Sequence, residues 1–377
     1  MPPIPADDLI WDEAGAKRQA RFVSARGGPP PKRAIAAGDE LSADAAFRLA
    51  SQGTAIVWTG DYHNARQLLQ ALGRRIDKRR TAPDAANPAA AFNAFRLAQA
   101  QRAGILGLLL VPVTDGAVPL RRAPDLRIAI EEAVGRLEGD SVVPLRDVLA
   151  FVSAHEWRKN GVTIPALGGA KIHPHYGVFP PTRQDYIDLV ATAPLPPGEI
   201  AFDLGTGSGI LAAVLLHRGV KRVVATDNAP SAIACAADNF ARLGLSDRVT
   251  LVEGDLYPDG KASLVACNPP WLPAKAGTSL ESAVYDPDGS MLRAYIGGLR
   301  DHLLPGGEGW LILSDLAEHL GLRTRQDLLM QFATAGLTVL GRLEAPPSSK
   351  AARDKDDPLY FARSKEVVSL WRLGSSA

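Results

Sequence analysis

Residues 202–209 read Phe-Asp-Leu-Gly-Thr-Gly-Ser-Gly, and this stretch decides the fold of the chain. It ends the strand-like segment Glu199–Leu204 and leads into Ile210–Arg218, an apolar segment typical of a helix. Glycines at such a junction let the chain turn tightly and let a ligand approach the backbone N–H groups at the helix start. In open α/β sheets, ligands bind beyond the carboxyl ends of the strands. The residues of this predicted ligand loop are Asp203, Gly205, Thr206, Gly207 and Gly209.

The spacing of these glycines argues against a dinucleotide-binding loop. That loop requires the pattern G-x-G-x-x-G, and Ile210 stands where its third glycine belongs. Three glycines can also form a packing turn that binds nothing, so the prediction of a ligand loop depends largely on the neighbouring segments.

The order strand, turn, helix repeats from these glycines toward the end of the chain. Such alternation indicates βαβ units and a mostly parallel sheet with helices on both faces. The last two strands are joined by a polar, proline-rich loop without a helix signal, so we expect an antiparallel pair at one sheet edge. The seven predicted strands are Glu199–Leu204, Arg222–Thr226, Val249–Val252, Ser263–Ala266, Trp310–Leu313, Thr338–Arg342 and Val367–Trp371.

An acidic residue follows the second predicted strand, and another follows the third. Asp227 comes about 20 residues after the glycines, where a carboxylate can accept hydrogen bonds from both hydroxyls of a ribose. Asp227 can instead cap the following helix, although Asn228 or Ser231 can fill that role. Asp255 closes the third strand, where Gly-Asp by itself is only a turn.

The most specific motif is Asn268-Pro-Pro-Trp271, which follows the fourth predicted strand. Two prolines cannot continue a central strand, and their fixed φ makes the segment a rigid frame. The Asn268 side-chain oxygen and the Pro269 carbonyl can together bind an NH₂ group, and Trp271 offers a flat face for stacking. The alternative is a loop with a buried tryptophan.

Taken in order, these features resemble the class I methyltransferases that use S-adenosylmethionine (SAM), and among them the N-methyltransferase branch. Motif IV of that branch reads (D/N)-P-P-(Y/F/W), which Asn268–Trp271 matches. The branch includes release-factor glutamine, N6-adenine and ribosomal-RNA guanine-N2 methyltransferases. The resemblance covers about residues 172–377. It implies a Rossmann-like, doubly wound α/β fold with SAM as the cofactor.

The resemblance also implies roles for single residues. An acid after the third strand accepts a hydrogen bond from the adenine amine, and its neighbour packs against the ring. The segment Tyr176–Arg183 resembles a stretch that lies over the SAM pocket, with its last two residues near the methionine end. Outside the glycine loop, the implied cofactor-binding residues are Asp227, Asn228, Asp255, Leu256, Thr182 and Arg183.

The expected reaction is direct transfer of the sulfonium methyl group to an amide or exocyclic nitrogen. These nitrogens are poor nucleophiles because their lone pair is delocalised. Oxygen acceptors on the two NH₂ protons would favour a tetrahedral nitrogen and stabilise its developing positive charge. The implied catalytic residues are Asn268, Pro269, Pro270 and Trp271.

We expect residues 1–165 to form a mainly helical substrate-recognition domain and residues 166–377 to form the methyltransferase domain. Residues 1–160 contain 22 Lys and Arg against 18 Asp and Glu. Short strands are expected at Thr54–Trp58 and Leu108–Val111. The densest basic run can contact phosphates or complement a helix dipole. This run consists of Arg74, Arg75, Lys78, Arg79 and Arg80.

Composition narrows the remaining possibilities. A net charge of +1 gives no global field for a polyanionic partner, and two cysteines provide no disulfide framework. The start of the chain lacks signal-peptide features, and the apolar run Ile105–Val113 is too short to span a bilayer, so we expect a cytoplasmic protein.

Other candidate residues have weaker patterns. His155, His173 and His175 lack a completing acid or thiol, so we expect no metal site. Cys267 is expected to be a buried thiol. Residues of secondary interest after motif IV are Asp286, Asp288 and Arg293.

Three functional interpretations stay open. A methyltransferase acting on a nucleobase, which would be flipped out of any duplex, is slightly favoured, with RNA ahead of DNA. A protein-glutamine methyltransferase acting on a release factor or ribosomal protein is the alternative. A SAM-fold binding protein without activity is the third. The oligomeric state is not predicted.

Overall fold

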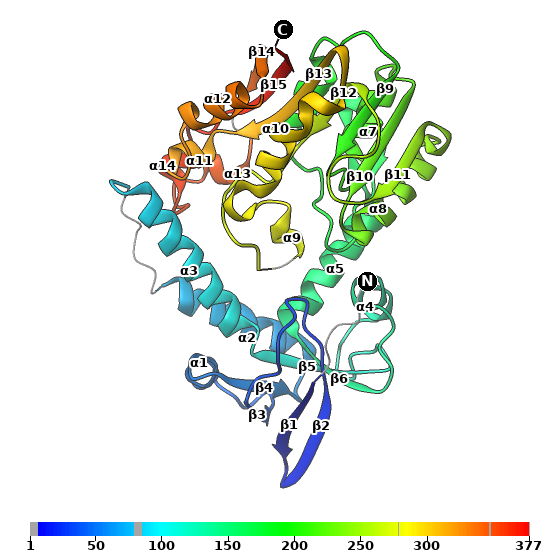
Figure 1. Ribbon diagram of the computed structural model, residues 1–377. Helices are drawn as coiled ribbons and strands as arrows, with labels where there is room; N and C mark the ends of the chain where they lie inside the picture. The colour runs from blue at the N-terminus through cyan, green and yellow to red at the C-terminus, as the bar shows by residue number, and fades with distance from the viewer. Residues whose placement is uncertain (1–6, 79–84, 278, 347, 377) are drawn as a thin grey trace. The chain divides into compact units, whose positions relative to one another are not determined.

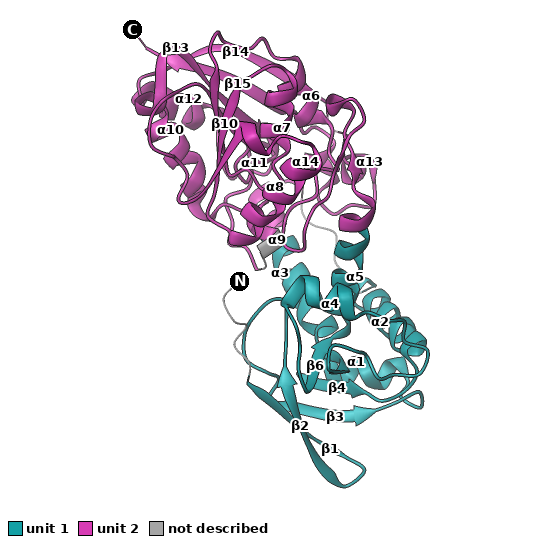
Figure 2. Cartoon of the chain, turned by 90° about the vertical axis from the view of Figure 1, so that its right-hand side faces the viewer, with its two compact units in different colours: residues 1–83, 93–156 teal, residues 84–92, 157–377 magenta. Residues whose placement is uncertain are grey.

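The computed structural model describes residues 7–78, 85–277, 279–346 and 348–376, in two compact units. The first unit consists of Met1–Pro83 and Asn93–Glu156, and the second of Asp84–Phe92 and Trp157–Ala377 (Figure 2). The expected boundary at residues 165 and 166 therefore lies inside the second unit.

Six strands of the first unit form a closed barrel in the order β1-β2-β6-β5-β4-β3 (Figure 1). A mainly helical half had been expected. The helices are present, but that expectation did not include a barrel. Four of the seven β2 residues are exposed and four are polar, which leaves a weak strand signal in the sequence. The strands are β1 Asp8–Glu13, β2 Ala16–Phe22, β3 Arg33–Ala37, β4 Thr54–Trp58, β5 Leu109–Thr114 and β6 Asp140–Pro144. The helices are α1 Ala43–Ser51, α2 Tyr62–Asp77, α3 Pro88–Leu106, α4 Arg127–Val134 and α5 Leu145–Asn160. Residues 88–92 of α3 and 157–160 of α5 belong to the second unit.

The second unit contains the predicted seven-stranded sheet, in the order β11-β10-β9-β12-β13-β15-β14. The first five strands in this order are parallel, and β15 runs antiparallel to both of its neighbours. This confirms the doubly wound, mostly parallel sheet with an antiparallel pair at one edge. The strands are β9 Ile200–Leu204, β10 Arg222–Asp227, β11 Val249–Glu253, β12 Ala262–Cys267, β13 Leu303–Ser314, β14 Leu337–Ala345 and β15 Val368–Ser375.

The connection between β14 and β15 differs from expectation. It had been predicted as a loop without a helix, but it contains the short helices α13, Lys350–Arg353, and α14, Tyr360–Arg363. Each is a single turn, and a single turn has too few residues to show helical periodicity. Upstream, the glycine-rich segment around residues 160–170 carries a small hairpin of β7, Val162–Thr163, and β8, Lys171–Ile172.

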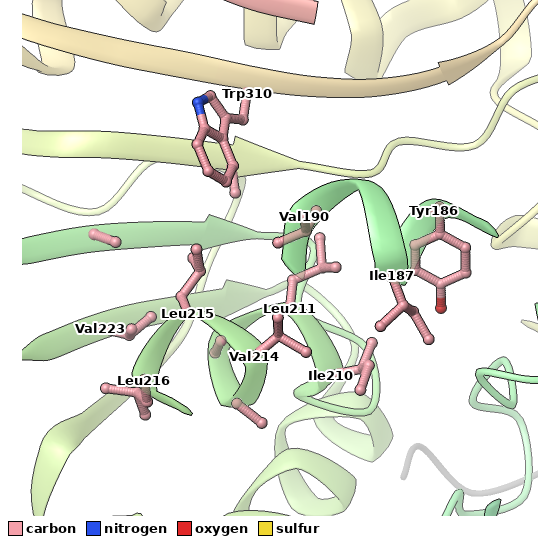
Figure 3. Close-up of a cluster of buried hydrophobic side chains, with 14 of the residues drawn as sticks. Tyr186, Ile187, Val190, Ile210, Leu211, Val214, Leu215, Leu216, Val223 and Trp310 are labelled. Atoms are coloured by element: carbon pink, nitrogen blue, oxygen red, sulfur yellow. The ribbon is translucent and has the colours of Figure 1, made fainter. Parts of the chain in front are cut away.

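Helices cover both faces of the sheet. Successive side chains of β13 alternate between two apolar clusters, so that Trp310 belongs to one and Leu311 to the other. The first cluster packs against α6, α7 and α8, and the second against α10 and α12. Figure 3 shows Ile187 and Val190 of α6 beside Leu211 of α7 in the first cluster. The bounds of these helices are α6 Asp185–Thr192, α7 Ile210–His217, α8 Pro230–Arg242, α10 Ser290–His302 and α12 Arg325–Thr334.

Helix α7 is buried along almost its whole length, from Ile210 to Leu216. A helix that is apolar all round packs on every side, which fixes the position of its N-terminus against β9. Separately, none of the described helices is long and apolar enough to cross a lipid bilayer.

We predict that Trp310→Ala destabilises the second unit by about 3–5 kcal/mol, because it leaves a cavity in the core. Trp310 is fully buried, and its indole N–H donates to Glu308 Oε2 at 3.0 Å. Urea unfolding followed by circular dichroism measures the loss. Trp157→Ala is the matched control, since that side chain is 42% exposed and its truncation should change little. Equal effects of the two substitutions would contradict the prediction.

Candidate functional site

A cavity of about 830 Å³ opens at the carboxyl ends of the parallel strands in the second unit. Most residues of the predicted site line it, although they come from five separate segments of the sequence. The predicted residues that line the cavity are Arg183, Gly205, Thr206, Gly207, Asp227, Asn228, Asp255, Leu256, Asn268, Pro269, Pro270 and Trp271. Thr182, Asp203 and Gly209 are not part of its lining.

The glycine loop contains glycines of two kinds. Gly207 has φ +55°, and no atom lies within 4 Å of the place a Cβ would occupy, so its backbone is open to the cavity. Gly209 has φ +82°, and a Cβ there would lie 2.7 Å from Cζ of Phe240. Gly207 therefore leaves space for a ligand, whereas Gly209 lets helix α8 pack closely.

Asp203 holds the loop from behind. It is 1% exposed, and its Oδ2 accepts hydrogen bonds from the Thr206 hydroxyl at 2.7 Å and the Ala212 N–H at 3.0 Å. Burial raises the pKa of Asp203 to about 6, with a smaller contribution from the charge of Asp227. Asp203 thus joins the end of β9 to the first turn of α7.

Asp227 joins the next strand to the same loop. One carboxylate oxygen accepts the Gly207 N–H at 3.0 Å, and the other accepts the Ala229 N–H at 2.9 Å. Burial raises the pKa of this carboxyl group. Each carboxylate oxygen can accept a second hydrogen bond, so contact with a ligand hydroxyl remains available. The two interpretations of Asp227 are therefore compatible, because it supports the start of α8 and also lines the cavity.

The segment after β11 bends sharply into the cavity wall. Leu256 has φ +65°, a conformation that non-glycine residues rarely adopt. The Thr226 hydroxyl holds it by donating to the Leu256 carbonyl at 2.5 Å. As a result Asp255 and Leu256 lie beside Asp227, at the neighbouring strand ends.

Asn268 and Trp271 are hydrogen-bonded to each other. The indole N–H of Trp271 donates to Asn268 Oδ1 at 2.9 Å. This contact orients the amide, because only its oxygen can accept from the indole. Oδ1 keeps a second lone pair for another donor. The turn follows β12, every residue of which is buried.

Arg183 braces Trp271 from one side. Its guanidinium carbon lies 4.8 Å from the centre of the indole ring, which is within the range of a cation–π contact. The same group forms ion pairs with Asp185 at 2.8 Å and Glu366 at 3.1 Å, whose side chains are each 3% exposed. Burial lowers the pKa of Arg183, but the hydrogen bonds and charges of these carboxylates outweigh it and leave the pKa raised.

The last wall of the cavity comes from the segment between β14 and β15, which the sequence analysis did not identify. Glu366 belongs to it, and it also accepts the Ser314 hydroxyl at 2.7 Å. The pairing of β13 with β15 brings these positions to the cavity from far along the chain. No local sequence motif marks them. Residues of this segment that line the cavity are Ser349, Ala351, Arg363 and Glu366.

The residues of secondary interest separate in the structure. Asp286 lines the cavity but is 4% exposed, and it accepts hydrogen bonds from the hydroxyl of Ser290 and the N–H groups of Met291 and Leu292. It therefore supports the start of α10. Asp288 and Arg293 contact each other, and neither lines the cavity.

The histidines singled out in the sequence each have a separate partner. His155 pairs with Glu132, His173 contacts the Arg158 carbonyl, and His175 pairs with Asp238. Within the described ranges, no group of three or more His, Cys, Asp or Glu side chains is arranged to hold a metal ion. Cys267 is fully buried, and burial raises its pKa well above the usual value.

Several known proteins are similar to this chain in sequence. The family model described as ribosomal protein L11 methyltransferase (PrmA) matches residues 187–269. A release factor glutamine methyltransferase from Cereibacter sphaeroides is 29% identical over 235 residues, which cover 56% of this chain and 84% of that protein. One from Moorella thermoacetica is 33% identical, over 35% of this chain and 54% of that protein.

A further sequence relative and a solved structure are also similar to this chain. A ribosomal protein L11 methyltransferase from Pelotomaculum thermopropionicum is 43% identical over 74 residues, 19% of this chain and 24% of that protein. A solved methyltransferase from Pyrococcus furiosus is 18% identical with a TM-score of 0.41, covering 59% of this chain and 96% of that one. The chain thus spans most of the first relative but about half or less of the next two. The second unit carries a SAM-dependent methyltransferase domain, and its cofactor is S-adenosylmethionine.

Proposed function

We propose that this chain is an active N-methyltransferase that methylates a planar NH₂ nitrogen of a macromolecule. One observation carries the proposal, namely the oriented amide of Asn268, held by Trp271 on the wall of the cavity. A protein that kept the fold only as a scaffold would have no need for an acceptor oxygen fixed at this place.

The residues around the glycine loop fit SAM. The open backbone of Gly207 leaves room for a ligand, and Asp227 offers acceptor oxygens for ribose hydroxyls beside it. We assign the ribose to Asp227 and Asn228, and the adenine to Asp255 and Leu256, which line the cavity at the next strand end. When bound, SAM supplies a methyl group carried on a positively charged sulfur.

The acceptor nitrogen belongs at Asn268–Trp271 in this proposal. Asn268 Oδ1 and the Pro269 carbonyl accept the two NH₂ protons, which draws the nitrogen out of conjugation and stabilises its developing positive charge. Trp271 stacks on the planar group with the face that Arg183 does not cover. The methylated nitrogen is acidic and loses its proton to water, so no dedicated base is required.

For Arg183 we propose positioning of Trp271 in place of a contact with the methionine end of SAM. Its ion pairs with Asp185 and Glu366 and its position over the indole support this assignment. Thr182 does not line the cavity, and we assign it no role. Asp203 and Gly209 support the loop and the packing of α8.

Two acceptors have the required chemistry. The glutamine amide is supported by two relatives that are named release factor glutamine methyltransferases. They match this chain over 84% and 54% of their own lengths. The exocyclic amine of a nucleobase in RNA is supported by the exposed basic residues of α2.

The proposal is tested by methyl transfer from labelled SAM into a lysate of cells that lack this protein, separated into RNA, DNA and protein. Label in RNA or DNA identifies a base, and label in protein identifies an amide. Label in no fraction, while SAM binding is measurable, would overturn the proposal of an active enzyme.

We predict that Asp227→Ala weakens SAM binding by about 1–3 kcal/mol, because ribose hydroxyls lose their acceptor. Isothermal titration calorimetry measures the affinity. Glu253→Ala is the matched control, since Glu253 pairs with Asp227 across the β10–β11 register but does not line the cavity. Unchanged affinity in Asp227→Ala would refute the assignment of the ribose.

We predict that Asn268→Ala binds SAM normally but loses turnover by about two to three orders of magnitude, the loss typical of removing one electrostatic acceptor or donor in an active site. Asn268→Asp should keep part of the activity, because a carboxylate oxygen also accepts from Trp271 and from the substrate. Radiolabel incorporation and SAM titration are measured side by side. Wild-type turnover in Asn268→Ala would exclude the proposed mechanism.

A further inference from the structure

We propose that the solvent-facing side of helix α2 binds the phosphate backbone of a single-stranded RNA. This surface, the α2 basic face, consists of Arg66 and Arg74 of α2 and of Lys78 at its C-cap. The three side chains are exposed, and the opposite side of the helix is buried against the first unit.

Helical geometry places the three cations on one side. At 3.6 residues per turn, Arg66, Arg74 and Lys78 fall within a sector of about 120°. They extend over about 18 Å of helix axis, at a rise of about 1.5 Å per residue. His63, Gln67 and Gln70 are exposed in the same sector and add further hydrogen-bond donors. A line of cations of this length can follow several consecutive phosphates.

These cations have no carboxylate partner among the residues that the structure describes. Among the described residues, none of Arg66, Arg74 and Lys78 forms an ion pair, whereas neighbouring arginines do. Arg75 pairs with Asp44 at 2.8 Å, and Arg102 of α3 pairs with Asp77 at 3.2 Å. The structure therefore removes Arg75 from the basic run seen in the sequence and adds Arg66. Arg79 and Arg80 lie outside the described residues.

The composition of the face favours nucleic acid over a protein partner. The centre of a protein interface is depleted in charged residues and enriched in aromatic ones. The α2 basic face has no apolar side chain in its sector, and its one acid, Asp77, is ion-paired. Nucleic-acid interfaces are polar and strongly positive, and side-chain donors to phosphate supply much of their affinity.

This inference deepens the proposed function and rests on it in one respect. RNA bound by the first unit would supply the nucleobase whose amine is methylated, which selects the base over the glutamine amide. The binding itself does not depend on SAM or on Asn268, so the two proposals can fail independently.

The test is fluorescence anisotropy of a labelled 20-nucleotide RNA with the full-length protein at several salt concentrations. The triple variant Arg66→Gln, Arg74→Gln, Lys78→Gln keeps helix propensity and removes three charges. Three lost phosphate contacts should reduce the slope of log K against log salt by about 2, at about 0.7 per contact for a single strand. At 0.1 M salt this corresponds to about 100-fold weaker binding.

The control variant Lys17→Gln, Arg26→Gln, Lys32→Gln removes the same charge from exposed positions elsewhere in the first unit and should leave the slope unchanged. Asp77→Asn should strengthen binding, because it removes the one acid and releases Arg102; a folding defect cannot imitate a gain. SAM affinity, measured in parallel, should be the same in all variants.

Three outcomes would overturn the inference. The first is equal loss of affinity in the test and control variants, which would show only a nonspecific charge effect. The second is binding of polyglutamate as tight as that of the RNA, which would indicate an acidic protein partner. The third is tighter binding of a DNA oligonucleotide of the same sequence, which would assign the face to DNA.

Discussion

The buried carboxylate of Asp203 is the constraint on which the cavity depends. A carboxylate this deeply buried is expensive to desolvate, and the raised pKa reflects that cost. Its hydrogen bonds to Thr206 and Ala212 compensate, and they fix the turn between β9 and α7. Asp227 then ties the end of β10 to Gly207 in the same turn. Two acids thus shape the loop, one from behind and one from the cavity side.

The opposite wall of the cavity depends on a second set of buried charges. Arg183 lies over Trp271 and is held between Asp185 and Glu366, so the position of the indole depends on groups from two distant segments of the chain. Separating the partners of a buried ion pair leaves uncompensated charges, which is energetically costly. Such a network therefore resists rearrangement and is rigid. Rigidity is what an oriented amide requires, because Asn268 is held by the same indole.

The proposals assign different roles to the two compact units: the second binds SAM and the acceptor nitrogen, and the first binds RNA. The seven-stranded sheet and the apolar clusters on its two faces maintain the shape of the cavity. The first unit is built on a six-stranded barrel with long helices, and the α2 basic face lies on the solvent side of one of these helices. Under these proposals the groups that hold SAM and the face that binds RNA belong to different units, so the target can change without disturbing the cofactor site.

The sequence by itself determined the sheet and the cofactor, and most of the site residues predicted from it line the cavity. Glycine spacing, strand–helix alternation and Asn268–Trp271 are local patterns, and the carboxyl ends of parallel strands meet at one edge. The tertiary structure alone decided that Asp203 faces away from the cavity, that Glu366 reaches it and that Arg183 covers Trp271. It also decided that six strands close a barrel in the first unit. These features depend on contacts between residues far apart in the chain, and periodicity within a short window carries no information about such contacts.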